Sequence, residues 1–456
     1  MTSGDLTSRD WWRPCSVQTV GEIPPESHAL APFMTRLLAS FEDQGHVVRD
    51  RSYGDVDLMF MYAHVPDGQA PLRDRIPEQC PPLSVTLRQA NGLRRNPAHV
   101  VAVVEIPESL SELPHRDVVE TARTLMGRVG AAKALFVTRG PAPGRVREVT
   151  FCNMEGGHPT EKENLADRLR DRLVTAACAC QVADRYDITT DALTAAAWKA
   201  SPTPERLADA GRRMGQLGLL SAPLRIADYV SPQLADMYEV YMGWKGFSEG
   251  MLFAFDPDLQ ALVVTASGSW DVDKRALNRD QVVVVDHRLR EGRLRVLAPE
   301  GTLPMQPSVE TWEVCALMEE APTVRVRKAH DGQWVLDPDG EREVPLIRGG
   351  IHAHVGVSSA NEAAVETVQP DRERFPYGFG CGTDLTVDLA RNTIRRSSAV
   401  NNTDDPRLYV RWPLLYHGEM AVELWKPGIP AEPFRGLLGL FGTDIRFTPD
   451  HVEQPL

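Results

Sequence analysis

The sequence predicts an α/β protein of two domains that meet near residue 200. The chain of 456 residues is longer than one hydrophobic core usually serves. Its first 200 residues alternate strand-like apolar runs with helical patterns, and a segment with two prolines, Ser201–Glu205, then precedes a new helical pattern. We therefore expect a Rossmann-like, doubly wound α/β domain of unknown role at residues 1–200 and a second domain at residues 201–456.

Continuous apolar runs predict the strands of the N-terminal half, because strands covered on both faces lack polar alternation. These runs are His46–Val48, Val56–Tyr62, His99–Ile106, Ala134–Thr138 and Val149–Cys152. Helical spacing of apolar residues lies between them, at His28–Phe41, Asp117–Val129 and Glu161–Ala183. The alternation predicts a doubly wound sheet, while the segments 161–183 and 190–200 could pack on either domain.

The N-terminal half contains no glycine-rich phosphate-binding signature. Gly156–His158 follows a predicted strand, and ligands gather at such strand ends in α/β sheets. A plain turn between strand and helix is the interpretation we favour for this segment. Whether this half carries a second activity or forms a lid over a substrate stays open.

Composition excludes some classes of partner. Hydrophobic residues make up 42% and charged residues 25% of the chain, as in globular proteins, and the formal net charge is −13. Such a surface repels nucleic acids and anionic membranes, whereas a small anionic substrate is compatible with it if a buried metal dominates the local field. The polar segment Met1–Pro14 has no apolar core of signal-peptide length, and no window is apolar enough to span a membrane. We expect a cytoplasmic protein that acts on a small molecule.

The seven cysteines are odd in number and form no disulfide framework, so we expect free thiols in a reducing compartment. The alternative, a zinc site on Cys178 and Cys180, lacks a second ligand pair at useful spacing.

Three histidines in the C-terminal half predict a metal site. His352 and His354 are two apart in a strand-like stretch, so both imidazoles point to one face. His417 lies in a second β-like run, before Gly418, which lets the backbone approach closely. Three imidazoles plus an open position are typical of a catalytic Lewis-acid site. The alternative is three unrelated histidines on solvated strand faces.

Glu310 is the candidate acid and base. It follows Pro307 and Ser308, which mark a helix start, so its structural alternative is charge complementarity at the helix N-terminus. Beside a divalent ion, and partly desolvated, a carboxylate can instead take and return a proton at a carbon next to a carbonyl.

The order of these segments resembles the class II aldolase and adducin family over about residues 205–422. The matching stretches are Gly246–Pro257, Ala261–Gly268, Gln281–Asp286, Gln306–Glu310, Gly350–Val355, Gly380–Leu385 and Leu415–Val422. The resemblance implies a three-layer α/β/α domain after the doubly wound one, and a homo-oligomer such as a tetramer. It implies a metal-dependent lyase that forms or breaks a C–C bond through a metal-stabilised enediolate or enolate.

The resemblance also implies roles for individual residues. His352, His354 and His417 would bind Zn²⁺, or else Mn²⁺ or Fe²⁺. Glu310 would transfer the proton, and Ser267, Gly268 and Ser308 would bind substrate. Decarboxylase, dehydratase and epimerase reactions occur on the same metal site, and adducin-like members are non-catalytic assembly modules, so these alternatives stay open.

The family's phosphate-binding motif G-N-[IL]-S-x-R is degraded in this chain. Gly250 is retained, but Met251, Phe253 and Phe255 replace three polar residues. A pocket lined by these side chains cannot offset the desolvation of a phosphate, and if they instead form a repacked core strand the phosphate contacts are still lost. We therefore expect a non-phosphorylated hydroxy-carbonyl or keto-acid substrate.

Other cations and ligands are weaker candidates. Lys274, Arg275 and Arg327 could bind an anion, although solvation at the surface is the commoner fate of such side chains. The stretch 328–348 reads as an inserted hairpin, in which His330 is a rival metal ligand. Tyr377 lies near Gly382 and Thr383 but one position out of register with the family's catalytic tyrosine, so no role is assigned to it.

Overall fold

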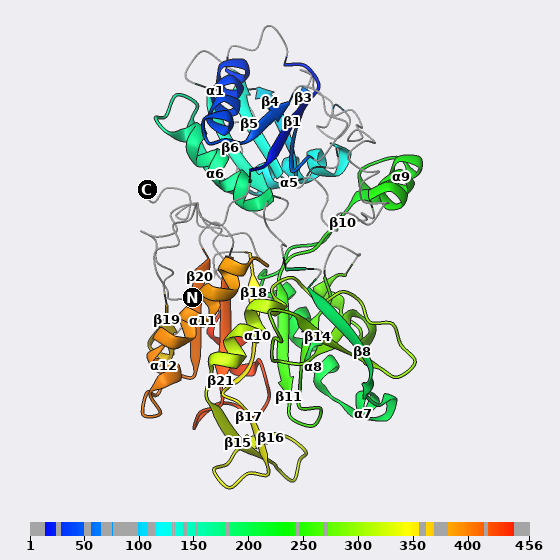
Figure 1. Ribbon diagram of the computed structural model, residues 1–456, viewed down its shortest axis with the longest axis vertical. Coiled ribbons are helices and arrows are strands. Elements are labelled where there is room, and N and C mark those ends of the chain that lie inside the picture. The colour runs from blue at the N-terminus through cyan, green and yellow to red at the C-terminus, as the bar shows by residue number, and fades with distance from the viewer. Residues whose placement is uncertain are drawn as a thin grey trace.

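The chain folds around two large β-sheets, one built from strands up to residue 159 and one from strands after residue 185 (Figure 1). The computed structural model describes residues 14–23, 29–49, 56–64, 75, 99–107, 115–129, 131, 133–139, 144–150, 154–177, 182–183, 185–242, 246–267, 272–354, 362–368, 382–414 and 418–441. Parallel and antiparallel strands and many helices make this a mixed α/β fold.

The first sheet is parallel over most of its width. In spatial order its strands are β2 (Val47–Arg49), β1 (Ser16–Val20), β3 (Leu58–His64), β4 (His99–Pro107), β5 (Lys133–Arg139), β6 (Arg145–Thr150) and β7 (Met154–Pro159). The strands from β2 to β5 are parallel, and β6 and β7 add an antiparallel edge.

Helices cover both faces of this sheet. They are α1 (Leu30–Asp43), α5 (His115–Val129) and α6 (Leu165–Ala177). Alternate residues of β3 point to opposite sides, so that Phe60 packs with α1 and α6 and Met61 packs with α5. Burial on both faces explains why β3 and β4 read as continuous apolar runs.

Two features of the first sheet differ from the sequence predictions. Strand β1 was missed because its Ser-Val-Gln-Thr-Val sequence is short and half polar. The interpretation of Gly156–His158 as a turn before a helix was wrong, because β7 pairs antiparallel with β6 through these residues. Two glycines in a strand weaken its sequence signal.

The second sheet is antiparallel in its centre. In spatial order its strands are β19 (Val365–Thr367), β20 (Tyr409–Leu414), β21 (Gly418–Leu424), β18 (Ile347–Ala353), β11 (Met251–Asp256), β12 (Ala261–Thr265), β13 (Val282–Val285), β14 (Leu294–Pro299) and β8 (Tyr186–Leu193). Only the two edge pairs, β19 with β20 and β14 with β8, are parallel among these described strands.

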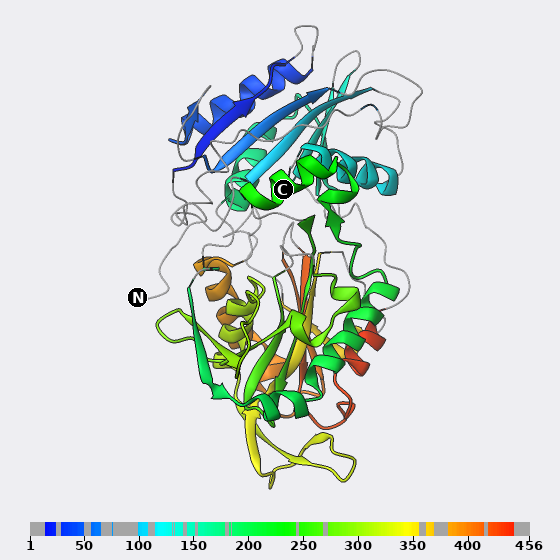
Figure 2. The same ribbon diagram turned by 90° about the vertical axis from the view of Figure 1, so that its right-hand side faces the viewer.

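Two helical layers enclose the second sheet (Figure 2). On one side lie α10 (Thr311–Glu320) and α11 (Asp384–Arg396), which pack on each other; on the other lie α8 (Thr203–Gln216) and α13 (Arg435–Leu440). The short helix α7 (Ala195–Ala200) precedes α8 in the chain, and the short helix α12 (Ser398–Asn401) follows α11. A single buried cluster joins these layers.

The predicted hairpin at 328–348 forms part of a small three-stranded antiparallel sheet. Its strands are β16 (Trp334–Leu336), β15 (Thr323–Lys328) and β17 (Arg342–Pro345). It lies at the far end of the second sheet from the first sheet (Figure 1).

Two segments cross the predicted boundary at residue 200. Strand β8 precedes that residue but belongs to the second sheet. A later segment packs on the first sheet: β9 (Leu224–Arg225), the 3-10 turn η1 (Ile226–Asp228) and α9 (Pro232–Met242) contribute Leu224, Ile226 and Tyr238 to the cluster around α5. The chain then returns through β10 (Gly246–Phe247), which pairs with β9. The division into domains at residue 200 stays a prediction.

Among the described residues no helix is long and apolar enough to cross a membrane.

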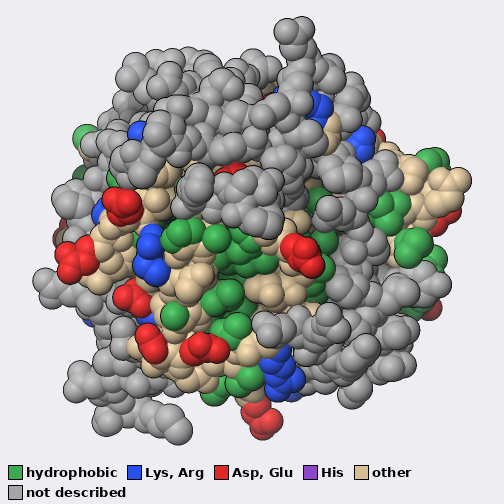
Figure 3. All heavy atoms as spheres, turned by 90° about the horizontal axis from the view of Figure 1, so that it is seen from above, with side chains coloured by type: hydrophobic (Ala, Val, Ile, Leu, Met, Phe, Trp, Pro, Cys, Tyr) green, Lys and Arg blue, Asp and Glu red, His purple; other side chains and the backbone are tan. Residues whose placement is uncertain are grey.

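Figure 3 shows the surface from the end of the molecule that carries the first sheet. On this face the described Asp and Glu side chains are scattered around a central area of apolar side chains.

Candidate metal centre

Strand β18 brings two of the predicted metal ligands together. It lies between β11 and β21 and is buried throughout, with His352 fully enclosed near its end. His354 follows the strand directly, and the two imidazole rings lie 4.8 Å apart, centre to centre. The carboxyl end of β18 is at the end of the second sheet that is nearer to the first sheet (Figure 1).

The backbone of β21 sets the tautomer of His352. Its Nδ1 lies 3.0 Å from the carbonyl oxygen of Glu419. A carbonyl only accepts, so Nδ1–H is the donor and Nε2 carries the lone pair of the neutral ring. Burial lowers the pKa of His352 to about 4; the bond to Glu419 opposes this shift and the charge of Lys274 adds to it. The imidazole is therefore neutral near pH 7, as metal binding requires.

A buried carboxylate that the sequence prediction missed stands behind His354. Glu249 is 4% exposed, and its Oε2 lies 3.7 Å from Nδ1 of His354. The backbone N–H of Ser221 donates to the other oxygen of this carboxylate at 2.6 Å. A carboxylate behind a histidine is a common support for a metal ligand, since it favours a proton on the near nitrogen and directs the far one outward. The signal in the sequence is only its place next to Gly250.

Helix α10 contributes the third member of the group. Glu310 is its N-cap residue and is buried, and the hydroxyl of Ser308 donates to its Oε2. One possible ligand atom from each of Glu310, His352 and His354 lies within 4.8 Å of the others. His417, the remaining predicted ligand, lies outside the described residues, directly before β21.

The predicted substrate-binding serines lie beside Glu310. Ala266, at the end of β12, bridges to Pro307, and the Ser267 N–H donates to the Gln306 carbonyl at 2.8 Å. This pairing brings Ser267 close to Ser308, whose hydroxyl is directed to Glu310. Gly268 lies outside the described residues.

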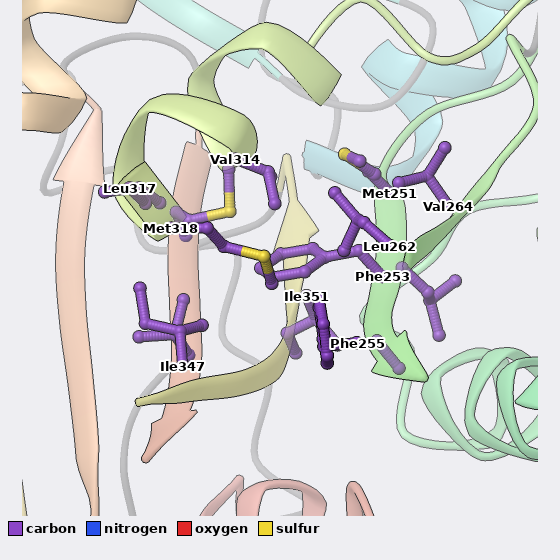
Figure 4. Close-up of a cluster of buried hydrophobic side chains, with 14 of the residues drawn as sticks. Met251, Phe253, Phe255, Leu262, Val264, Val314, Leu317, Met318, Ile347 and Ile351 are labelled. Carbon is purple, nitrogen blue, oxygen red and sulfur yellow. The ribbon is translucent and has the colours of Figure 1, made fainter. Parts of the chain in front are cut away.

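The apolar side chains of β11 that stand in place of the polar residues expected from the resemblance belong to the core rather than to a pocket lining. Met251, Phe253 and Phe255 are at most 4% exposed. They pack with side chains of β12, β18 and α10, as Figure 4 shows for Leu262, Ile351 and Met318 among others. The interpretation of these residues as part of a core strand therefore holds.

Gly250, directly before β11, has a steric reason to be glycine. Gly250 has φ +77°, and a Cβ there would lie 2.9 Å from the carbonyl oxygen of His352 and 2.5 Å from Cδ2 of Leu220. Only glycine adopts this conformation without strain and lets the chain pass so close to β18.

The three candidate cations have different surroundings. Lys274 is 3% exposed, and its Nζ donates to Ser248 Oγ at 3.1 Å. Arg275 forms a bidentate pair with Asp273, and Arg327 pairs with Asp337 in the small sheet.

Two further residues singled out in the sequence are not part of the candidate metal-binding group of described residues. His330 lies in the turn between β15 and β16, outside that group. Tyr377 lies outside the described residues.

Glu313 is a second carboxylate that sequence reasoning did not single out. It lies one turn after Glu310 in α10, and the Gly382 N–H donates to its Oε1 at 2.9 Å. Burial raises the pKa of Glu313 to about 7, with a further contribution from Glu310 and opposition from the hydrogen bonds of Gly382 and Thr386. The Glu-x-x-Glu spacing was the available signal, since it places both groups on one helix face.

The donors present suit a divalent transition metal. Imidazole nitrogens with one carboxylate oxygen are typical ligands for Zn²⁺, Mn²⁺ or Fe²⁺. The hydrogen bond that keeps Nε2 of His352 deprotonated and the carboxylate behind His354 both fit such an ion.

No model of a known protein family matches the chain, and no curated protein matches it. Among solved structures, L-fuculose 1-phosphate aldolase resembles part of the chain, with 14% identity and a TM-score of 0.25 over 49% of this chain and 76% of that one.

Proposed function

We propose that the chain is a metal-dependent lyase that breaks or forms a carbon–carbon bond next to a carbonyl group. The observation that carries the proposal is the convergence of Glu310, His352 and His354 from two distant segments, with ligand atoms within 4.8 Å. The order of motifs in the sequence supports the same reaction class.

Each residue has a separate task in this proposal. His352 and His354, with His417 as the third ligand, would hold a divalent ion such as Zn²⁺. When bound, such an ion acts as a Lewis acid that polarises a carbonyl oxygen. Glu310 would then take a proton from one substrate group and return it to another, and Ser308 orients the carboxylate for this transfer.

The buried environment suits this work. Glu310 and His352 are both largely shielded from water, which strengthens electrostatic interactions within the site. In the metal-free protein His352 is neutral, and Glu249 lies beside Nδ1 of His354. The first imidazole is therefore in the protonation state that metal binding needs, and the carboxylate favours a proton on the near nitrogen of the second, so that its far nitrogen can bind an ion.

The substrate we propose is a non-phosphorylated hydroxy-carbonyl compound or a keto acid, cleaved by retro-aldol reaction. The apolar packing of Met251, Phe253 and Phe255 supports this choice, because they stand where the family motif has polar phosphate contacts. Decarboxylation of a hydroxy or keto acid is the rival reaction, and release of CO₂ rather than of an aldehyde distinguishes it. We also propose a homo-oligomer, which light scattering would test.

Metal content measured by elemental mass spectrometry tests the proposal first. We expect about one ion per chain after incubation with Zn²⁺ or Mn²⁺, and loss of that ion in the double variant His352→Ala, His354→Ala. His330→Ala is the matched control, because this histidine lies in the turn between β15 and β16, outside the group. Absence of metal from the folded wild-type protein would refute the lyase and favour an adducin-like assembly module. Metal without turnover of any hydroxy-carbonyl or keto-acid substrate would refute the reaction class alone.

A further inference from the structure

Lys274 is a buried cation whose position is held from two sides. It opens the 3-10 turn η3 (Lys274–Ala276) and is 3% exposed. A Cβ at Gly211 would lie 2.0 Å from the Lys274 carbonyl oxygen, so α8 packs directly on its backbone. At the other end of the side chain, the Nζ donates to Ser248 Oγ at 3.1 Å.

Ser248 belongs to the short segment that lies against the metal centre. The next residue, Glu249, approaches His354, and Gly250 passes beside the carbonyl oxygen of His352. The ammonium group is therefore hydrogen-bonded to the same loop that approaches both histidines.

We propose that Lys274 binds the carboxylate of the substrate, which would make the substrate a hydroxy or keto acid. This inference rests on the proposed lyase function and names its substrate class. A desolvated ammonium attracts an anion more strongly than an exposed one, because water screens the pair less. The hydrogen bond to Ser248 holds the nitrogen in place, so little side-chain freedom is lost on binding.

The two other cations singled out in the sequence, Arg275 and Arg327, point elsewhere. The carboxylate of Asp273 accepts two hydrogen bonds from the guanidinium of Arg275, which points this adjacent cation to its own loop. Arg327 lies in the small sheet beside Asp337. A single ammonium also matches a carboxylate monoanion better than a phosphate dianion, which usually takes several donors.

Binding of two small chelators to the metal-loaded full chain tests the inference. Oxalate and acetohydroxamate both chelate divalent ions through two oxygens, but only oxalate carries carboxylates. By isothermal titration calorimetry we expect Lys274→Met to lower the affinity for oxalate by about 10- to 100-fold and the affinity for acetohydroxamate by less than about twofold. Ser248→Ala should lower the affinity for oxalate by a smaller factor. Arg275→Met, which removes the adjacent cation, should leave both affinities unchanged.

Metal content and thermal unfolding of every variant are measured beside the affinities. Equal oxalate affinity in wild type and Lys274→Met, at full metal content, would overturn the inference while leaving the lyase proposal intact. If the wild type binds no metal, the lyase proposal fails, and oxalate is titrated into the metal-free protein. Binding that depends on Lys274 would then still support the anion site, and absent or Lys274-independent binding would overturn it too.

Discussion

Replacing Glu249 by glutamine is expected to weaken metal binding at His354 without unfolding the chain. The carboxylate is 1% exposed in its side chain and lies 3.7 Å from Nδ1 of His354, where its charge makes the opposite nitrogen a better ligand. Loss of such a supporting group typically costs about 10- to 100-fold in metal affinity. Because 3.7 Å exceeds hydrogen-bond length, we expect the lower end, about tenfold or 1.4 kcal/mol. Glutamine retains an oxygen for the Ser221 N–H, so stability should change little.

Competition with a chromophoric chelator for Zn²⁺ at pH 7 measures this affinity, and thermal unfolding measures stability. Glu423→Gln is the matched control. Glu423 is also fully buried, but it lies near Arg348 at 3.8 Å and accepts the Phe434 N–H, away from the described metal-ligand group. This control should change unfolding and not Zn²⁺ affinity. Unchanged Zn²⁺ affinity in Glu249→Gln would refute the supporting role of this carboxylate.

Three further perturbations follow from the same contacts. Glu148→Ala leaves two buried cations of the first sheet without their shared carboxylate, so urea unfolding should show a loss of about 3–5 kcal/mol; a loss below about 1 kcal/mol would contradict this. Gly250→Ala forces a Cβ against the His352 carbonyl oxygen, and we expect lower metal occupancy in the folded fraction, whereas full occupancy would show that the strand tolerates the shift. The pKa of Glu313 is raised from 4.5 to about 7, so its folded form binds the extra proton; its contribution to stability is present below pH 4.5 and is lost as the pH rises through about 7. Urea titrations from pH 4 to 8 should show this loss, on the order of 3 kcal/mol, in wild type and not in Glu313→Gln; equal pH profiles would refute it.

The strands of the first sheet show what a local pattern can predict. Strands β3, β4 and β5 were predicted from apolar runs, because burial on both faces leaves the same signature in any sequence. Strand β1, which lies between β2 and β3, and the edge strand β7 escaped prediction, since pairing with neighbouring strands orders a polar or glycine-rich segment. Such pairing is a long-range property that a short window does not contain.

The proximity of His352 and His354 in the candidate metal centre could also be predicted locally. His352 and His354 share one strand, so their spacing alone placed both rings on one side. Glu310 and Ser308 were singled out from a helix start and from the order of motifs. Their approach to the histidines depends on α10 packing across the sheet, which the structure shows directly.

The sequence by itself determined the α/β class, most strands, the candidate ligands and the apolar character of β11, because these depend on residue types at short spacing. Only the tertiary structure decided that Met251, Phe253 and Phe255 are core, that Glu249 lies beside His354, and that Lys274 is buried and hydrogen-bonded to Ser248. The reason is physical: these roles depend on which distant segments come into contact and exclude water. A charge or an aromatic ring has no fixed role in a sequence until its neighbours in space are known.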